Sequence, residues 1–313
     1  MTCITRQSDS IHGRPQRALV KVGLEDRAVR DIHRILLPLD LTEATLPTAV
    51  IQHALGLARH FHSEIILLHV VKPFTYLGTS EATRQLLEQA VAAEHEKLNK
   101  CLGLHLNGVP IRRLVLEGDP AREIVRAIRD EKVDLIVMPT HGYGPLQRFL
   151  LGSVTLKVLH NRACPVWTAA HVEDAPGQNF AIRKVLCGVD FSPHSAKTIQ
   201  WAQELATEFD AELTLAHVTP GVEIYGPGGH YVLDEMKREL VGSASRKLEA
   251  LKQELGSNAA TFIGSGDIPK VMRQAAEETK ADVLVVGSRS IGGRIGNTAY
   301  GIIRESPVPV LSV

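Results

Sequence analysis

The strongest constraint on the fold is that this chain of 313 residues repeats itself once. The segment RILLPLD, which ends at Asp40, matches KVLCGVD, which ends at Asp190. Further matches follow in the same order: EIILLHV with ELTLAHV, Gly118-Asp119 with Gly266-Asp267, VDLIVMPT with ADVLVVGS, and Gly152 with Gly296. The offset between partners stays between 144 and 150 residues. Landmarks that recur in one order at a nearly constant spacing indicate two copies of one domain.

Each copy alternates short apolar runs with stretches of helical periodicity. In the first copy we expect strands at 34–39, 65–71, 112–117, 134–139 and 165–169, and helices at 49–61, 80–102, 121–129 and 154–161. The apolar runs do not alternate with polar residues, so both faces of the sheet should be buried under helices. The pattern predicts an α/β protein with two tandem doubly wound open parallel sheets, five strands each with helices on both faces.

The repeat also divides the chain. We expect a first domain at 32–170, a linker at 171–181, where Pro, Gly and polar residues gather, and a second domain at 182–313. Residues 1–31 have no counterpart in the second copy, and we expect them to form a flexible N-terminal extension.

Composition excludes several classes of partner. Lys plus Arg number 35 and Asp plus Glu also number 35, so the formal net charge is zero and gives no field that attracts nucleic acid or an anionic membrane surface. No apolar run approaches the ~20 residues needed to cross a bilayer. The cysteines are scattered without a CxxC pair, which is typical of cytosolic thiols. We therefore expect a cytoplasmic protein that binds neither nucleic acid nor a membrane.

In open parallel sheets, ligands bind beyond the carboxyl ends of the strands, where the strand order reverses. Asp40 and Asp190 each close the first predicted strand of their copy. A carboxylate there can accept hydrogen bonds from a ribose hydroxyl or an adenine amine. Capping of the following helix is the alternative, and the residues alone leave both open.

The segment PTHGYGPLQRFLLGSV, residues 139–154, links a predicted strand to a predicted helix. A glycine loop that leads into a helix start presents free backbone N–H groups to phosphates. We expect Gly142, Gly152 and Ser153 to meet phosphates, with the positive end of the next helix behind them. A Mg²⁺ or Mn²⁺ ion would bridge the phosphates rather than sit in a protein cage. An ordinary loop that needs glycine is the alternative.

ILLPLD, IILLHV, EGDPAREI, and THG followed after nine residues by GSV resemble the universal stress protein family, over roughly residues 33–313. Nucleotide-binding members carry Gly, two residues, Gly, nine residues, then Gly-Ser or Gly-Thr. Here Gly142 and Gly152-Ser153 match, and Pro139 replaces the first Gly. The resemblance implies an ATP site with Mg²⁺ or Mn²⁺. Its residues would be Pro38, Asp40 and Val70 around the adenosine, Met138, Thr140, His141 and Gly142 along the ribose and phosphates, and Gly152, Ser153 and Val154 over the phosphates.

Both copies depart from the family pattern. Pro139 lacks an N–H, which removes one backbone donor in the first copy. In the second copy, Gly287 and Gly296 are 9 positions apart, against 13 between Pro139 and Gly152. Ser290 stands where the second Gly belongs, so we expect a degenerate second site and ATP in the first copy only.

The resemblance implies an ATP-binding stress-response module rather than an enzyme. Such a module would act through conformation or through contact with an unknown protein partner. A scaffold that binds no nucleotide and a slow ATP hydrolase stay open as alternatives. The family also pairs domains through their last strands, so 165–168 and 309–312 should meet inside this chain, and a dimer of chains stays open above that.

Other constellations assign no catalytic residue and no protein metal site. There is no GxxxxGK[ST] motif. His60 and His62 lack a third ligand and are expected to form a solvated pair. His69 and His217 are expected to be core histidines, hydrogen-bonded to a neighbouring strand or loop, and Gly226–Gly229 a flexible loop.

Overall fold

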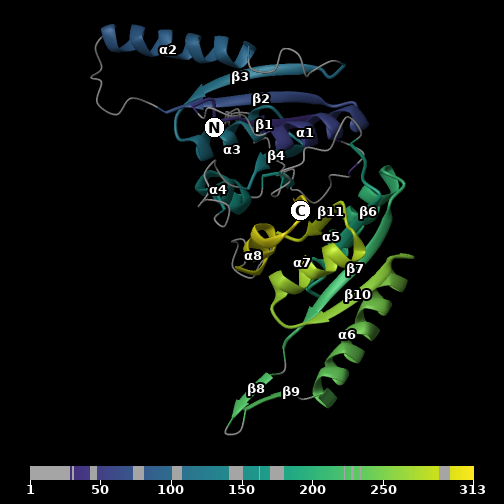
Figure 1. The fold of residues 1–313 in the computed structure, drawn as a ribbon. Coiled ribbons are helices and arrows are strands. Elements are labelled where there is room, and N and C mark those ends of the chain that lie inside the picture. The colour runs from purple at the N-terminus through teal and green to yellow at the C-terminus, as the bar shows by residue number, and fades with distance from the viewer. Residues whose placement is uncertain are drawn as a thin grey trace, which may run out of the picture.

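The computed structural model describes residues 29, 32–42, 48–72, 81–100, 108–140, 151–161, 163–169, 180–221, 223–226, 229–232, 234–288 and 297–313. Strands and helices alternate along these residues, and the protein has the α/β fold that the sequence predicts (Figure 1).

The first half contains five strands and four helices. They are β1 (Arg34–Pro38), α1 (Thr48–Phe61), β2 (Glu64–Val71), α2 (Glu81–Lys100), β3 (Ile111–Glu117), α3 (Pro120–Asp130), β4 (Leu135–Pro139), α4 (Ser153–Asn161) and β5 (Val166–Ala169). Each begins and ends within two residues of the predicted bounds.

The second half repeats this order and adds a hairpin. Its elements are β6 (Lys184–Gly188), α5 (Ser195–Glu208), β7 (Glu212–Thr219), β8 (Glu223–Gly226), β9 (Gly229–Val232), α6 (Asp234–Glu254), β10 (Ala260–Ser265), α7 (Ile268–Thr279), β11 (Val283–Val286), α8 (Asn297–Glu305) and β12 (Val310–Ser312). The antiparallel hairpin of β8 and β9 projects away from the main sheet (Figure 1).

The hairpin corrects one prediction. Gly226 and Gly229 were expected to lie in a flexible loop, but they form the last pair of a two-stranded ladder. The reason is that residues which favour strands precede Gly226 (Ile224, Tyr225) and follow Gly229 (Tyr231, Val232).

One ten-stranded sheet runs through both halves, in the order β10-β7-β6-β11-β12-β5-β4-β1-β2-β3. Neighbouring strands are parallel within each half, whereas β12 and β5 are antiparallel, with Val310 opposite Thr168. The Thr168 hydroxyl donates to the Val310 carbonyl at 3.1 Å. The two halves therefore join through their last strands, the arrangement that the family resemblance implies.

The core consists of one apolar layer on each face of this sheet. Ile35 and Leu37 of β1 belong to one layer, and Leu36 between them belongs to the other. Each layer contains residues of both halves. Burial on both faces explains why the strands are continuous apolar runs.

The repeated Gly-Asp landmark begins a helix in each half. Asp119 and Asp267 are the N-cap residues of α3 and α7, and their carboxylates accept hydrogen bonds from the amides of Arg122 (3.0 Å) and Lys270 (3.3 Å). The preceding residues, Gly118 and Gly266, have φ angles of 148° and 126°, which favour glycine. The repeated Gly-Asp pair is therefore explained by the start of a helix in each half.

Among the helices described, none is long and apolar enough to span a membrane.

Candidate nucleotide site

The candidate site lies at the carboxyl ends of β1 and β4. From β1 the chain continues outward through β2 and β3, then returns to form β4 on the other side of β1. The strand order therefore reverses between β1 and β4, as it does between β6 and β11 in the second half. Crevices at such reversals are where open α/β sheets bind ligands.

The sheet brings several predicted residues to this edge. The β1–β4 register pairs Leu36 with Ile136, and its continuation sets Pro38 level with Met138. Thr140 follows β4 directly, and Val70 is the penultimate residue of β2. Pro38 and Val70 are half-buried, whereas Met138 is buried. His141 and Gly142 lie outside the described residues.

Gly152 joins the end of β4 to the start of α4. Its amide donates to the Thr140 carbonyl at 2.8 Å, and its own carbonyl accepts the first helical hydrogen bond from Leu156 at 2.8 Å. Gly152 is therefore the N-cap residue, and its N–H is engaged within the protein. The amides of Ser153, Val154 and Thr155 belong to the first turn, which has no intrahelical acceptor for them.

Pro139 fits the end of β4 without breaking the strand. It is the last residue of β4 and pairs with Ala169 of β5. Its carbonyl accepts a hydrogen bond from the Thr155 hydroxyl at 3.0 Å. Thr155 was missed from sequence, although a hydroxyl in the first turn of a helix is a recognisable signal. The Thr140 side chain is also buried, so a ligand would meet this residue through its backbone.

Asp40 presents an exposed carboxylate beyond the end of β1, the strand next to β4. It accepts hydrogen bonds from the Thr42 amide (3.0 Å) and the Thr42 hydroxyl (2.6 Å). This local turn fixes the side chain two residues beyond the strand. The carboxylate still has acceptor capacity for a ligand, because an ionised carboxylate has about four lone-pair sites.

The corresponding Asp190 of the second half braces the next helix. It accepts from the Ser192 amide (2.9 Å) and from the hydroxyl of Ser195, the first residue of α5 (2.8 Å). Burial alone would raise the pKa of Asp190, but these hydrogen bonds stabilise the charged form and hold the pKa below its usual value. Asp190 thus contacts the first residue of α5 through its hydroxyl, but the N-cap residue of that helix is His194, so Asp190 does not cap it.

The end of β11 is held by the strand that follows it, as the end of β4 is held by β5. The Ser288 amide donates to the carbonyl of Val313 at 2.7 Å, and the Val313 amide donates to Val286 at 3.0 Å. In the first half Ala169, which aligns with Val313, likewise pairs with Pro139 at the end of β4. Residues 289–296, which include Ser290, lie outside the described part of the chain.

The structure tests the predictions for three of the histidines. His69 and His217 are hydrogen-bonded as predicted: their Nδ1 atoms lie 2.9 Å from the Leu39 carbonyl and 2.7 Å from the Val189 carbonyl. His69 is buried in the core, whereas His217 is half-buried. The prediction of a solvated pair is wrong for His60, whose ring stacks on Phe209 of the second half with centroids 3.8 Å apart. The sequence could not show this contact, because the fold alone brings residues so far apart together. Within the described residues, no group of three or more side chains could hold a metal ion.

Comparisons with known proteins agree with this architecture. The model of the universal stress protein family matches residues 31–169 and 181–313. A universal stress protein of Methanocaldococcus jannaschii is 37% identical over 136 residues, which are 42% of this chain and 79% of that protein. One from Bacillus subtilis is 31% identical over 147 residues, 42% of this chain and 97% of that protein.

Among solved structures, a universal stress protein from Archaeoglobus fulgidus is similar over both halves. It has a TM-score of 0.63 at 24% identity and covers 90% of this chain and 96% of its own. At this identity the similarity concerns the fold. Two family matches in series, at the positions of the two halves, account for the repeated sequence and the single sheet. This chain belongs to the universal stress protein family, in a tandem form.

Proposed function

We propose that the first half binds ATP at the carboxyl ends of β1 and β4. The observation that supports this most is the start of α4, which the Gly152–Thr140 hydrogen bond fixes against the end of β4. Its first-turn amides and helix dipole favour an anion. The exposed Asp40 carboxylate on the neighbouring strand end is suited to a ribose or an adenine amine.

The proposed contacts divide the nucleotide into three parts. Pro38, Asp40 and Val70 would surround the adenosine. Met138, Thr140, His141 and Gly142 would line the ribose and phosphates, and Gly152, Ser153 and Val154 would close over the phosphates. Mg²⁺ or Mn²⁺ would bridge phosphate oxygens, and water molecules would supply its remaining ligands.

The second half would not bind ATP in this way. Its segment from Gly287 to Gly296 spans 9 positions, against 13 from Pro139 to Gly152, and Asn297 replaces Ser153. This asymmetry supports a regulatory module with one nucleotide site per chain, which acts in the cytoplasm through conformation or contact with a partner. A scaffold that binds no nucleotide is the second candidate, because the β5–β12 pairing already unites the halves without a ligand.

Isothermal titration of ATP with Mg²⁺ tests the proposal. The variants are Ser153→Asp in the first half and Asn297→Asp at the matching helix start of the second, with Gly152→Val and Gly296→Val as a second pair. An acidic residue in a first turn favours the helix but repels phosphate, so it separates binding from folding. We expect one site per chain, weakened at least about tenfold by Ser153→Asp, equivalent to about 1.4 kcal/mol, and unchanged by Asn297→Asp.

The absence of binding heat and of an ATP-dependent melting shift in the wild type would favour the scaffold. Steady phosphate release that Gly152→Val abolishes would favour a slow hydrolase.

A further inference from the structure

His69 links helix α2 to the segment that carries Asp40. The ring is buried, with 3% of its surface exposed, and Nδ1 lies 2.9 Å from the Leu39 carbonyl. The Leu41 amide lies 3.4 Å from the same nitrogen. One nitrogen cannot both donate to Leu39 and accept from Leu41, and the shorter distance assigns the Nδ1 proton to the Leu39 bond. His69 therefore holds the backbone of the residue just before Asp40.

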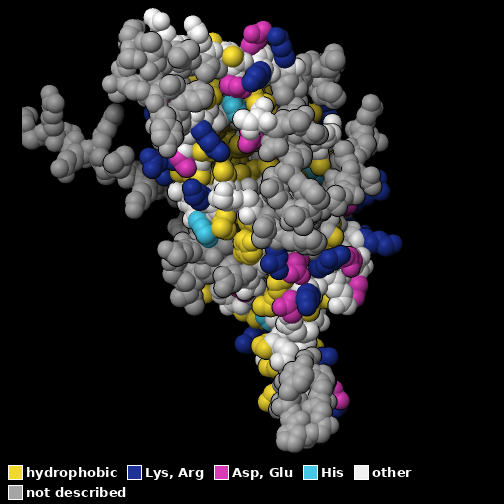
Figure 2. All heavy atoms as spheres, turned by 60° about the vertical axis from the view of Figure 1, so that its left-hand side comes forward, with side chains coloured by type: hydrophobic (Ala, Val, Ile, Leu, Met, Phe, Trp, Pro, Cys, Tyr) yellow, Lys and Arg dark blue, Asp and Glu magenta, His cyan; other side chains and the backbone are white. Residues whose placement is uncertain are grey.

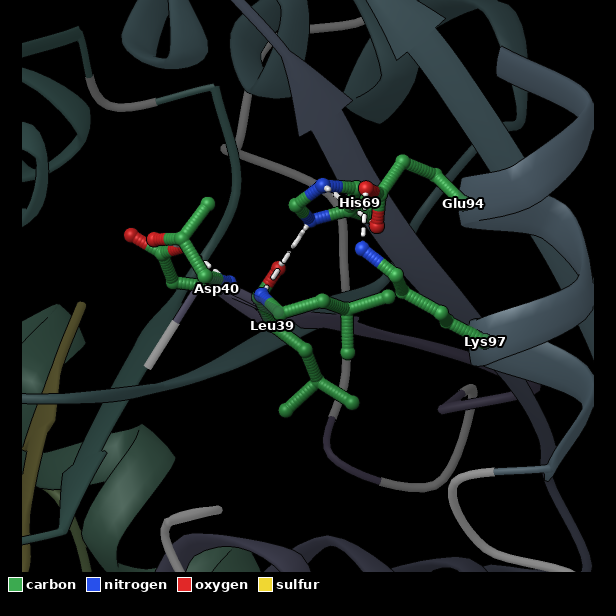
Figure 3. Close-up of polar contacts among 7 residues, drawn as sticks. Leu39, Asp40, His69, Glu94 and Lys97 are labelled. Carbon is green, nitrogen blue, oxygen red and sulfur yellow. Dashed lines mark hydrogen bonds and ion pairs between the residues drawn. The ribbon is translucent and has the colours of Figure 1, made fainter. Parts of the chain in front are cut away.

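The opposite side of the ring faces α2 (Figure 3). The Nε2 atom lies 3.8 Å from Glu94 Oε2, which is buried and has no hydrogen-bond partner. The other carboxylate oxygen, Oε1, accepts from Lys97 at 2.7 Å. A chain of polar contacts thus runs from Lys97 and Glu94 on the helix, through the ring of His69, to Leu39 and Asp40 at the end of β1.

The second half retains the histidine, but among its described residues His217 forms no ion pair with an acidic side chain. His217 makes the matching contact with the Val189 carbonyl at 2.7 Å. Its ring packs against Phe191, with centroids 4.2 Å apart, and Lys247 of α6 lies 5.8 Å from the Phe191 centroid. The ring of Phe191, which aligns with Leu41, therefore lies between His217 and the cation of Lys247. Among the described residues, the contact through which an acidic side chain of a helix reaches the end of the first strand, Glu94 to His69, lies in the half that carries the proposed site.

We propose that His69 is a positioning residue that couples helix α2 to the nucleotide site through Leu39 and Asp40. The coupling rests on the proposed function where it concerns ATP, but the contact itself exists without a ligand. Glu94 lies against one side of the ring, and the other side is bonded to the Leu39 carbonyl. A ligand that holds Asp40 then orders α2, and by reciprocity a change at α2 alters affinity for the ligand.

The first test uses the full-length chain without nucleotide. Amide NMR signals of Leu39 to Thr42 are compared between the wild type and Glu94→Gln, in both the native and the His69→Leu background. We expect Glu94→Gln to shift these signals and His69→Leu to abolish that shift. Signals that do not respond to Glu94→Gln, or that shift equally in both backgrounds, would overturn the proposal. Lys247→Gln, on the matching helix, is the control and should leave these signals unchanged.

The second test measures ATP affinity and the exchange of α2 amides over residues 91–100. We expect His69→Leu to weaken binding about fivefold, the lower end of typical coupling factors. Glu94→Gln should remove the ATP-dependent protection of α2 while binding persists, and His69→Asn, which keeps a donor for Leu39, should retain most of the affinity. Full α2 protection in Glu94→Gln would overturn the coupling. If the wild type binds no ATP, the proposed function fails, whereas the first test still decides whether the link exists.

Discussion

A buried histidine at the junction of the halves should make this protein sensitive to mild acid. His53 of α1 is 7% exposed, and its ring lies 5.9 Å from that of Trp167 and 5.5 Å from that of Phe180. Neither ring nitrogen has a hydrogen-bond partner among the described residues. Burial disfavours the charged form and lowers the pKa of His53 from 6.5 to about 4.

The sign of the effect follows from proton binding. Between pH 6.5 and about 4 the unfolded chain binds a proton at His53, whereas the folded chain does not. The contribution of His53 to the free energy of unfolding is therefore fully present above pH 6.5. It is lost as the pH falls toward 4. A difference of 2.5 pKa units between 6.5 and about 4 corresponds to roughly 3 kcal/mol, at about 1.4 kcal/mol per unit.

Urea unfolding of the wild type and of His53→Leu, at pH 7 and pH 4.5, measures this contribution. Subtracting the free energy of unfolding of one protein from that of the other at each pH cancels the contributions of the other titrating groups. We expect the variant to gain roughly 2 kcal/mol relative to the wild type between pH 7 and pH 4.5. Parallel pH dependence of the two proteins would refute the account of His53 as a buried neutral base.

The contact between Gly56 and Phe180, the pairing of β5 with β12, and the candidate site each yield a further prediction. Gly56→Ala would place a Cβ against the ring of Phe180, and we expect a loss of about 1–3 kcal/mol in the free energy of unfolding; an unchanged urea midpoint would show that the ring moves aside freely. Thr168→Val removes the hydroxyl that bonds to Val310, and should cost about 1 kcal/mol in the same assay; no loss would mean that the ladder alone holds β5 to β12. Pro139→Gly restores a backbone N–H at the end of β4 and should tighten ATP binding by up to about tenfold, the value of one hydrogen bond; unchanged affinity in calorimetry would show that this amide does not contact the nucleotide.

Much of the fold could be predicted from the sequence because the information is local or repeated. Apolar runs such as 134–139 mark buried parallel strands, and the Gly-Asp pairs mark helix starts. The position of the candidate site also follows, since Asp40 and Thr140 come just after the two strands between which the strand order reverses.

What the sequence could not show depends on contacts between distant segments. The stacking of His60 on Phe209 joins α1 to the end of α5, and no periodicity records it. The engagement of the Gly152 amide by Thr140 is likewise a matter of loop geometry. In the space-filling view, hydrophobic, charged and polar side chains intermingle on the visible face (Figure 2). The pattern agrees with a chain of zero formal net charge.

The central claim is that two halves of one fold differ in nucleotide binding. Hydrogen exchange of the wild-type chain with and without ATP and Mg²⁺ tests it most directly, because one experiment reads both halves. We expect slower exchange at 38–42 and 151–158, with no change at 188–192 and 297–304. Equal protection of both halves, or none in the first, would contradict it.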